Sequence, residues 1–433
     1  MAALPNTNAT PPLPTAPTKA GGRRRALLAV ASFFALKVAF GVVILAISAK
    51  RLSVAEFASF SQLFLFLALL SSVASGGVQN GVVREVAAAH GDIHREKRVI
   101  GGGIVIWACF SLPVMLAMLI LQDVIATMLV GNRAVAPTVV GLTVIALLAG
   151  LGTLLCSALS GSNRAPLSLF IQGIGLVIGG ALSIERLWAG DGERAVLFYA
   201  LGPLVSAFLS VAASRHWLVR LSPGWREARR EAVSLLTYSG AFLAVVSALP
   251  LVLFGTRYMY RLEFGAELLG YWLLANRASD VTTQIVGLYL SQVYLPQVTR
   301  SKTESERLTL IRRTLALGIA VAGAGALVFA LASGPIVTLL LSDRYLPALP
   351  FVLGYLVGDM FRVGGNVALF TALAARRLKL FVSIESGLAL LVGTAILAGI
   401  ALGYPAAAWW GYLAAHATAL TIVLFSLRRI ARF

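Results

Sequence analysis

Residues 26–49 read ALLAVASFFALKVAFGVVILAISA, an apolar stretch with a single charge, Lys37, near its centre. A helix needs about 20 mostly apolar residues to cross a bilayer, so this stretch is long enough to span one. A charged side chain at mid-membrane costs about 2.5–3.5 kcal/mol on insertion scales. Lys37 is therefore expected to face a polar cavity or a partner rather than lipid.

The composition of the whole chain is that of a membrane protein. Of its 433 residues, 58% are hydrophobic and 12% are charged, whereas a soluble domain carries roughly 25% charged residues. A soluble fold is thereby excluded. The chain has 36 basic and 18 acidic residues, an excess that in a soluble protein would suggest a nucleic-acid partner, so the placement of the basic residues has to be considered.

Eleven further stretches resemble the first in length and apolar character. They predict an all-α polytopic membrane protein with about twelve transmembrane helices. The predicted spans are residues 26–49, 57–83, 99–121, 136–160, 166–183, 196–213, 232–255, 267–291, 314–334, 348–374, 380–402 and 407–427.

The connections between these spans divide the basic residues unequally between the two sides of the membrane. Most of the 36 basic residues fall on the side that carries both termini. Lys and Arg concentrate in cytoplasmic loops, so both termini are predicted to be cytoplasmic. The excess of basic residues then reflects the membrane topology, and some of these residues are expected to contact anionic lipid. Nucleic acid is not an expected partner.

The loop pattern divides the chain into two six-helix halves. Residues 26–213 and 232–427 form the predicted lobes, and residues 214–231 form a cytoplasmic loop between them. Residues 1–25 are rich in Pro, Ala and Thr and are predicted to be a disordered cytoplasmic tail. Residues 428–433 form a short basic cytoplasmic tail. Two lobes of this kind place a binding site at their interface.

Two later spans carry oppositely charged residues three positions apart, Arg277 with Asp280 and Asp359 with Arg362. Residues at this spacing share one face of a helix, so each pair could be an ion pair that offsets its own burial. Alternatively, Arg277 and Arg362 bind an anionic substrate together with Lys37, while Asp280 or Asp359 carries a coupling proton or cation. The sequence leaves both interpretations open.

Other polar residues within the spans are weaker candidates. Glu385, near the cytoplasmic boundary of the eleventh span, is either an interfacial residue or a coupling site. Gln79 and Asn80, at the end of the second span, could line a cavity or hold helices together. Asn276 precedes Arg277 and is a candidate for a polar contact with a substrate.

Neither catalytic nor metal-binding patterns occur in the sequence. The two cysteines, Cys109 and Cys156, both lie within apolar spans, which argues against a disulfide framework or a cysteine metal site. Phosphate-binding and zinc-protease motifs are absent, and the loops are too short for a soluble catalytic domain. The chain is therefore predicted to need no metal or other cofactor and not to be an enzyme.

Four stretches resemble the oligosaccharidyl-lipid flippases of the polysaccharide transporter family, the Wzx-type flippases of the MOP superfamily. The stretches are AKRLSVAEF at 49–57, GGVQNGVVR at 76–84, LGYW at 269–272 with Asn276, Arg277 and QVYLP at 292–296, and SDRYLP at 342–347. Their order and spacing, with twelve spans and short loops, extend the resemblance along nearly the whole chain.

The resemblance implies two lobes around a central cavity that opens alternately to each side, as in MATE-type transporters. It also implies a substrate, an oligosaccharide linked to an undecaprenyl-diphosphate type of lipid, moved to the outer leaflet for O-antigen, common-antigen or exopolysaccharide synthesis. The cavity cations would be Lys37, Arg277 and Arg362, with Arg51 and Arg84 nearer the mouths. Contact with polysaccharide polymerase or chain-length machinery is left open.

Two other functions are compatible with the span pattern. A cation-coupled multidrug antiporter of the same superfamily would favour acidic residues in the cavity, whereas Lys37 favours an anionic substrate. A membrane polysaccharide polymerase or ligase would usually carry a long outer loop, and the predicted outer loops here are short. The flippase interpretation is therefore preferred.

Overall fold

The computed structural model describes residues 20–89, 91–218, 225–375 and 377–431, apart from some side chains within helices, among them Asn80 and Tyr238. Every regular element in these ranges is helical. The longer helices are α1 (Ala20–Arg51), α2 (Val54–Ala74), α3 (Gln79–Ala88), α4 (Ile93–Val130), α5 (Ala136–Leu159), α6 (Ala165–Trp188), α7 (Gly192–Ala213), α9 (Trp225–Tyr289), α11 (Glu304–Leu340), α12 (Leu349–Ala374), α13 (Leu378–Ala401) and α14 (Ala407–Ala431). The shorter ones are η1 (Arg133–Val135), η2 (Ser160–Arg164), α8 (Arg215–Leu218), η3 (Leu290–Tyr294), α10 (Leu295–Arg300) and η4 (Asp343–Ala348).

Nine helical segments within the described ranges are long and apolar enough to cross a membrane, which confirms the prediction of an all-α polytopic membrane protein. One of these segments, residues 133–188, contains both α5 and α6. α9 contains two predicted spans and reverses at Gly265, whose φ of 86° and ψ of 172° lie outside the helical region. A positive φ is readily adopted by glycine and disfavoured for other residues.

The predicted span 57–83 is wrong at its end, because the helix breaks after Ala74 and α3 begins only at Gln79. Gly76 and Gly77 between them have φ values of 59° and 67°. A side chain on Gly77 would also place its Cβ 2.9 Å from the carbonyl oxygen of Ser239. Glycine is therefore required here both for the backbone conformation and for the approach of α9.

The predicted tails and loop are shorter in the structure than in the sequence interpretation. Residues 20–25 belong to α1, and residues 428–431 belong to α14. Within the predicted loop 214–231, α8 and the start of α9 are helical. Residues 1–19, 219–224 and 432–433 lie outside the described ranges.

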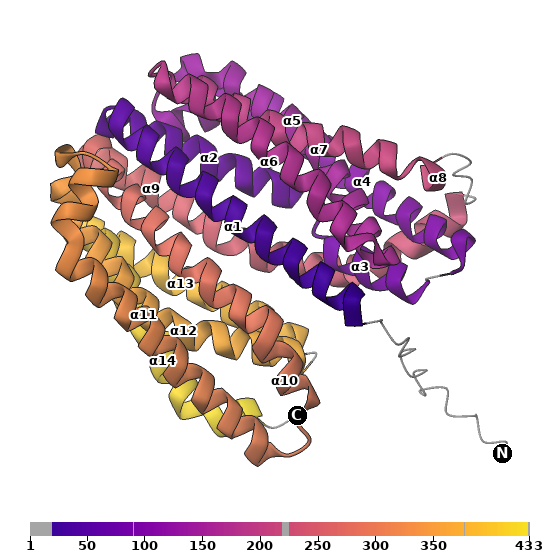
Figure 1. Cartoon of the computed structure of the whole chain (residues 1–433). Coiled ribbons are helices and arrows are strands. Elements are labelled where there is room, and N and C mark those ends of the chain that lie inside the picture. The colour runs from indigo at the N-terminus through magenta and orange to yellow at the C-terminus, as the bar shows by residue number, and fades with distance from the viewer. Residues whose placement is uncertain (1–19, 90, 219–224, 376, 432–433) are drawn as a thin grey trace.

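The helices are arranged in two groups, as Figure 1 shows. Helices α1–α7 pack among themselves, α11–α14 do likewise, and α9 contacts α2 and α4 in one group and α12 and α13 in the other. We call the end at which α1 begins and α14 ends the proximal end, and the opposite end the distal end. The ribbons of the two groups meet at the distal end and diverge toward the proximal end (Figure 1).

Aromatic packing joins the two groups at the distal end. Phe57 of α2 meets the ring of Tyr345 of η4 edge-on, with 5.5 Å between ring centroids. Val54 lies so close to Gly270 of α9 that a Cβ there would be 2.6 Å from a Val54 methyl group. Buried aromatic pairs of this kind contribute about 0.5–1.5 kcal/mol beyond the area they bury, so the distal contact is a packed interface.

Basic side chains also cross between the groups at this end. The Lys50 ammonium donates to the carbonyl oxygen of Leu339 at 2.7 Å. In the opposite direction, Arg344 donates to the carbonyl oxygen of Leu52 at 3.0 Å. These acceptors lie in the last turn of α11 and just after α1, where carbonyl groups lack intrahelical partners and carry the negative end of the helix dipole.

Arg261 of α9 makes a third contact of this type. Its guanidinium donates to the carbonyl oxygen of Leu129 in the last turn of α4 at 3.5 Å. Gly131, with a φ of 75°, ends that helix, and any Cβ there would overlap the Arg261 guanidinium. We call Lys50, Arg261 and Arg344 together the distal latch.

Candidate substrate cavity

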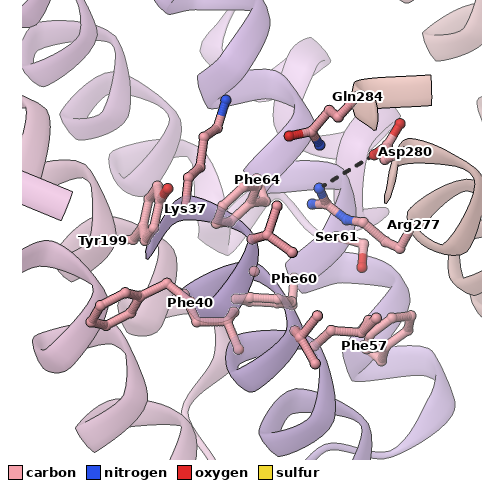
Figure 2. A pocket seen from close by; sticks show the side chains of 15 residues that line it. Lys37, Phe40, Phe57, Phe60, Ser61, Phe64, Tyr199, Arg277, Asp280 and Gln284 are labelled. Carbon is pink, nitrogen blue, oxygen red and sulfur yellow. Dashed lines mark ion pairs between the residues drawn. The ribbon is translucent and has the colours of Figure 1, made fainter. Parts of the chain in front are cut away.

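A cavity of about 150 Å³ lies between the two groups near the middle of the helices. It is bounded by α1, α2, α7 and the second half of α9. Figure 2 shows Lys37 on one wall and Arg277 with Asp280 on another, separated by the ring of Phe64. The cavity therefore brings together cations that are distant in the sequence.

Arg277 is held in place from two sides. Its guanidinium is 3.9 Å from the Asp280 carboxylate, one turn further along α9, and lies over the Phe64 ring at 4.6 Å. Arg277 and Asp280 therefore form an ion pair, as one of the two interpretations of the sequence described. A separation of 3.9 Å is longer than a direct hydrogen bond, so that contact leaves guanidinium N–H groups available to a ligand.

Lys37 and Arg277 each line two neighbouring cavities. Lys37 also lines a chamber of about 360 Å³ within the first group, which we call the α5–α7 chamber and whose polar lining includes Thr153, Gln172 and Ser206. Arg277 also lines a chamber of about 230 Å³ beside α9 and α12, the α9–α12 chamber. The three cavities therefore form one row, with a cation at each junction.

Arg257 is a further buried cation, which falls between the predicted spans 232–255 and 267–291 and was therefore expected in a connection rather than in a helix. It is 3% exposed, lines the α9–α12 chamber, and donates to the Asn276 side-chain oxygen at 3.1 Å. Its guanidinium lies 5.7 Å from the Trp272 ring centroid. The first half of α9 continues to Gly265, so Arg257 lies two turns inside the helix.

Asp359 and Arg362 are linked through a third residue, Tyr412, rather than by the direct ion pair that one interpretation of the sequence described. The Tyr412 hydroxyl donates to Asp359 Oδ1 at 2.7 Å and accepts from the Arg362 guanidinium at 3.2 Å. Ser279 also donates to Asp359 Oδ1, at 2.7 Å. Among the described residues, Asp359 Oδ2 is buried without a hydrogen-bond partner.

Further titratable groups surround this network. Glu385 of α13 is half-buried and interacts electrostatically with Arg362. His416 is fully buried beside Tyr412, with 4.3 Å between ring centroids. Neither ring nitrogen of His416 has a partner among the described residues. Two acidic residues and one histidine therefore lie near Arg362 inside the second group.

The remaining predicted site residues lie outside the central cavity. Arg51 is at the distal end, 4.0 Å over the Trp188 ring, and Arg84 lies in α3 near Glu85. Gln79 donates to the Ser75 hydroxyl at 2.9 Å, which fits the packing interpretation of that segment. The Asn80 side chain is outside the described residues.

The all-helical architecture is that of the MOP superfamily fold. A solved structure of the lipid II flippase MurJ in an inward closed conformation matches with a TM-score of 0.72 and 11% identity, over 92% of this chain and 87% of that one. An inward-facing multidrug resistance MATE transporter matches with a TM-score of 0.67 and 12% identity, over 91% and 94% of the two chains.

Sequence comparison places the chain more narrowly. Residues 44–350 match the family described as polysaccharide biosynthesis protein, so the chain belongs to that family. A relative in Escherichia coli (strain K12), named lipid III flippase, is 24% identical over 368 residues, which cover 83% of this chain and 87% of the relative.

Proposed function

We propose that this protein is a flippase that translocates a polyprenyl-diphosphate-linked oligosaccharide from the cytoplasmic to the outer leaflet. The observation that carries the proposal is the pair of cations, Lys37 and Arg277, on different walls of one cavity between the helix groups. The family match and the lipid III flippase relative support the same class of substrate.

The chemistry of the cavity suits a diphosphate. Hydrogen bonds between a cationic donor and a phosphate are about twice as strong as neutral ones, and the Arg277 guanidinium presents several donors in one plane. Fixed cations at mid-membrane replace the hydration that the diphosphate loses on entering hydrocarbon. Tyr199 and Gln284 line the same cavity and supply polar groups for the first sugar.

Transport would proceed by alternating access between two lobes, residues 26–213 and 232–427. In the described state the distal latch and the aromatic contacts hold the distal end closed. With both termini in the cytoplasm of a bacterial cell, this state would admit substrate from the cytoplasmic leaflet of the inner membrane. Opening of the latch would then release the oligosaccharide on the outer side.

A coupling ion would enter at the acidic groups of the second lobe. Asp359 is the preferred site, since its Oδ2 atom is buried without a partner, with Asp280 and Glu385 nearby. The same observation supports a second candidate function, a cation-coupled multidrug antiporter, and the MATE structures share the fold. The cavity cations favour the flippase, because an organic-cation substrate would be repelled by Lys37 and Arg277.

The flippase would perform no covalent chemistry and would need no cofactor. Its partners would be the lipid-linked oligosaccharide and membrane lipids, with polysaccharide polymerase or chain-length machinery acting on the product. A polymerase or ligase is disfavoured because short connections join the helices at the distal end, leaving little room there for a catalytic domain.

Translocation in proteoliposomes tests the proposal. Purified protein would be reconstituted with a labelled polyprenyl-diphosphate oligosaccharide, and the labelled sugar accessible at each face would be followed over time. Protein-dependent translocation supports the flippase. Its absence, together with gradient-driven efflux of an organic cation from the same vesicles, would assign the chain to the antiporters.

A further inference from the structure

An apolar groove of about 520 Å³ runs along the outside of the first helix group between α1 and α6. Its walls are aromatic and aliphatic side chains, including Phe33 and Leu36 of α1 and Leu169, Phe170 and Ile174 of α6. Charged residues are absent from the described lining of this groove. It therefore suits a hydrocarbon ligand.

Aromatic rings of α1 approach glycines of α6 in and beside the groove. A Cβ on Gly173 would lie 4.0 Å from the Phe33 ring, and one on Gly180 would overlap the ring of Phe40. Both the aromatic residues and the glycines are seven positions apart, which repeats on one helix face about every two turns. α1 packs chiefly against α6; Phe33 and Gly173 line the groove, and the contact between Phe40 and Gly180 lies beside it.

The groove is separated from the interior by one side chain. Phe33 lines both the groove and the α5–α7 chamber. One turn further along α1, Lys37 lines that chamber and the central cavity. The apolar groove thus adjoins, at Phe33, the chamber whose lining includes Lys37.

This order of environments fits a lipid whose headgroup enters the protein. Lys37 is fourteen residues from the distal end of α1, or roughly 20 Å at 1.5 Å per residue, which places it deep in the membrane. An ordinary phospholipid keeps its phosphate at the membrane surface, so its headgroup would not reach the depth of Lys37. If the diphosphate of a single-chain lipid occupied the central cavity, its hydrocarbon tail would have to pass laterally between helices to reach the bilayer.

We propose that the α1–α6 groove binds the isoprenoid units next to the diphosphate, with Phe33 as the divider past which the chain leaves the interior. This inference rests on the proposed flippase function. It adds a hydrocarbon subsite to the cationic site and assigns the lateral exit of the lipid tail to α1 and α6.

Photocrosslinking locates the tail. Reconstituted full-length protein would be irradiated with a polyprenyl diphosphate bearing a diazirine in its first isoprenoid units, and in parallel with phosphatidylglycerol bearing a diazirine in its acyl chain. Labelled peptides would be identified by mass spectrometry. We expect the polyprenyl probe to label residues 169–178, with at least a fivefold decrease under excess unlabelled polyprenyl diphosphate. Labelling of this segment by the phospholipid probe alone, or without competition, would overturn the proposal.

Filling the groove gives a second, functional test. Gly173→Leu adds a side chain to the groove wall, starting 4.0 Å from the Phe33 ring, and Gly325→Leu adds the same side chain at an exposed, open position of α11. Labelling and translocation should both fall about tenfold in the first variant and stay at the wild-type level in the second. Val177→Trp, at the exposed rim of the groove, repeats the test if Gly173→Leu does not fold.

The two proposals can fail separately. Wild-type translocation with unchanged rates in both groove variants would remove the tail site and leave the flippase standing. Absence of wild-type translocation would remove the flippase, and competed labelling of residues 169–178 would then still identify a polyprenyl-diphosphate binding site.

Discussion

The distal latch and the central cavity use the same residue types in opposite ways. At the distal end, Lys50, Arg261 and Arg344 donate to main-chain carbonyl groups of the opposite group of helices. In the cavity, Lys37 and Arg277 face a space between the groups. Position in the bundle, rather than residue type, decides whether a cation holds the two groups together or is available to a ligand.

The acceptors explain why the latch can open. Carbonyl groups in the last turn of a helix have no intrahelical partner, so water can replace the cation without leaving a buried group unsatisfied. The lysine and arginine heads at this end would likewise be hydrated on opening. In the cavity, by contrast, a cation at mid-membrane has little water and is stabilised most by an anion.

Removal of a cavity cation should have the largest effect. Lys37→Ala and Arg277→Ala each delete a charged donor whose hydrogen bonds contribute about 1.5–3 kcal/mol, so translocation of polyprenyl-diphosphate oligosaccharide should fall by about 10- to 100-fold. Initial rates in proteoliposomes measure this. Lys302→Ala, an exposed residue before α11, is the matched control, and equal rates in all variants would refute the cationic site.

The buried carboxylate should affect coupling rather than binding. Asp359→Asn keeps an oxygen that accepts from Ser279 and Tyr412 but cannot take up a proton or attract a cation. We expect translocation to lose its dependence on an imposed proton or sodium gradient, measured as the ratio of rates with and without the gradient. Glu385→Gln is the comparison, and loss of gradient dependence there with retention in Asp359→Asn would reassign the coupling site to Glu385.

Weakening the latch should shift the conformational equilibrium by a smaller amount. Arg344→Ala removes a contact worth about 1 kcal/mol, which corresponds to about a fivefold change in the ratio of closed to open states. Spin labels on Arg133→Cys and Tyr404→Cys, in a background without Cys109 and Cys156, report the separation of the two groups at the distal end. The population at long distance should grow. An unchanged distance distribution would mean that aromatic packing alone closes this end.

A change in stability, rather than in substrate handling, should come from the close approach at the proximal side. Gly77→Ala introduces a Cβ at a φ of 67° and 2.9 Å from the Ser239 carbonyl oxygen, which should lower the melting temperature by a few degrees at about 1–3 kcal/mol of strain. Gly325→Ala, in a helix with open space around it, should leave the melting temperature unchanged or raise it slightly. Equal melting temperatures for the wild-type protein and Gly77→Ala would show that α9 moves to accommodate the added Cβ without strain.

Sequence patterns predicted the helical membrane fold because hydropathy and length decide it almost alone. They also identified Lys37, Arg277 and Asp280, since a charge within an apolar run is visible without a structure. The Tyr412 bridge between Asp359 and Arg362 was not predictable, because it joins α12 to α14 through tertiary packing.

Errors in the sequence interpretation have similar causes. Arg257 was placed in a loop because the reversal of α9 at Gly265 could not be distinguished from an earlier one. The break at Gly76 and Gly77 was missed because the predicted span was continued to residue 83, although Ser75, Gln79 and Asn80 beside the two glycines are polar. The order of the three cavities could not be predicted from the sequence, because it depends on which side chains line two cavities at once.

Equilibrium binding to variants of α1 tests the central comparison most directly. Lys37 and Lys50 lie on the same helix, one in the cavity and one in the distal latch. Affinity for a polyprenyl diphosphate would be measured for the wild-type protein, Lys37→Ala and Lys50→Ala in detergent. We predict at least about tenfold weaker binding for Lys37→Ala and wild-type affinity for Lys50→Ala. Equal affinity in all three proteins, or equal loss in both variants, would contradict the division between cavity and latch.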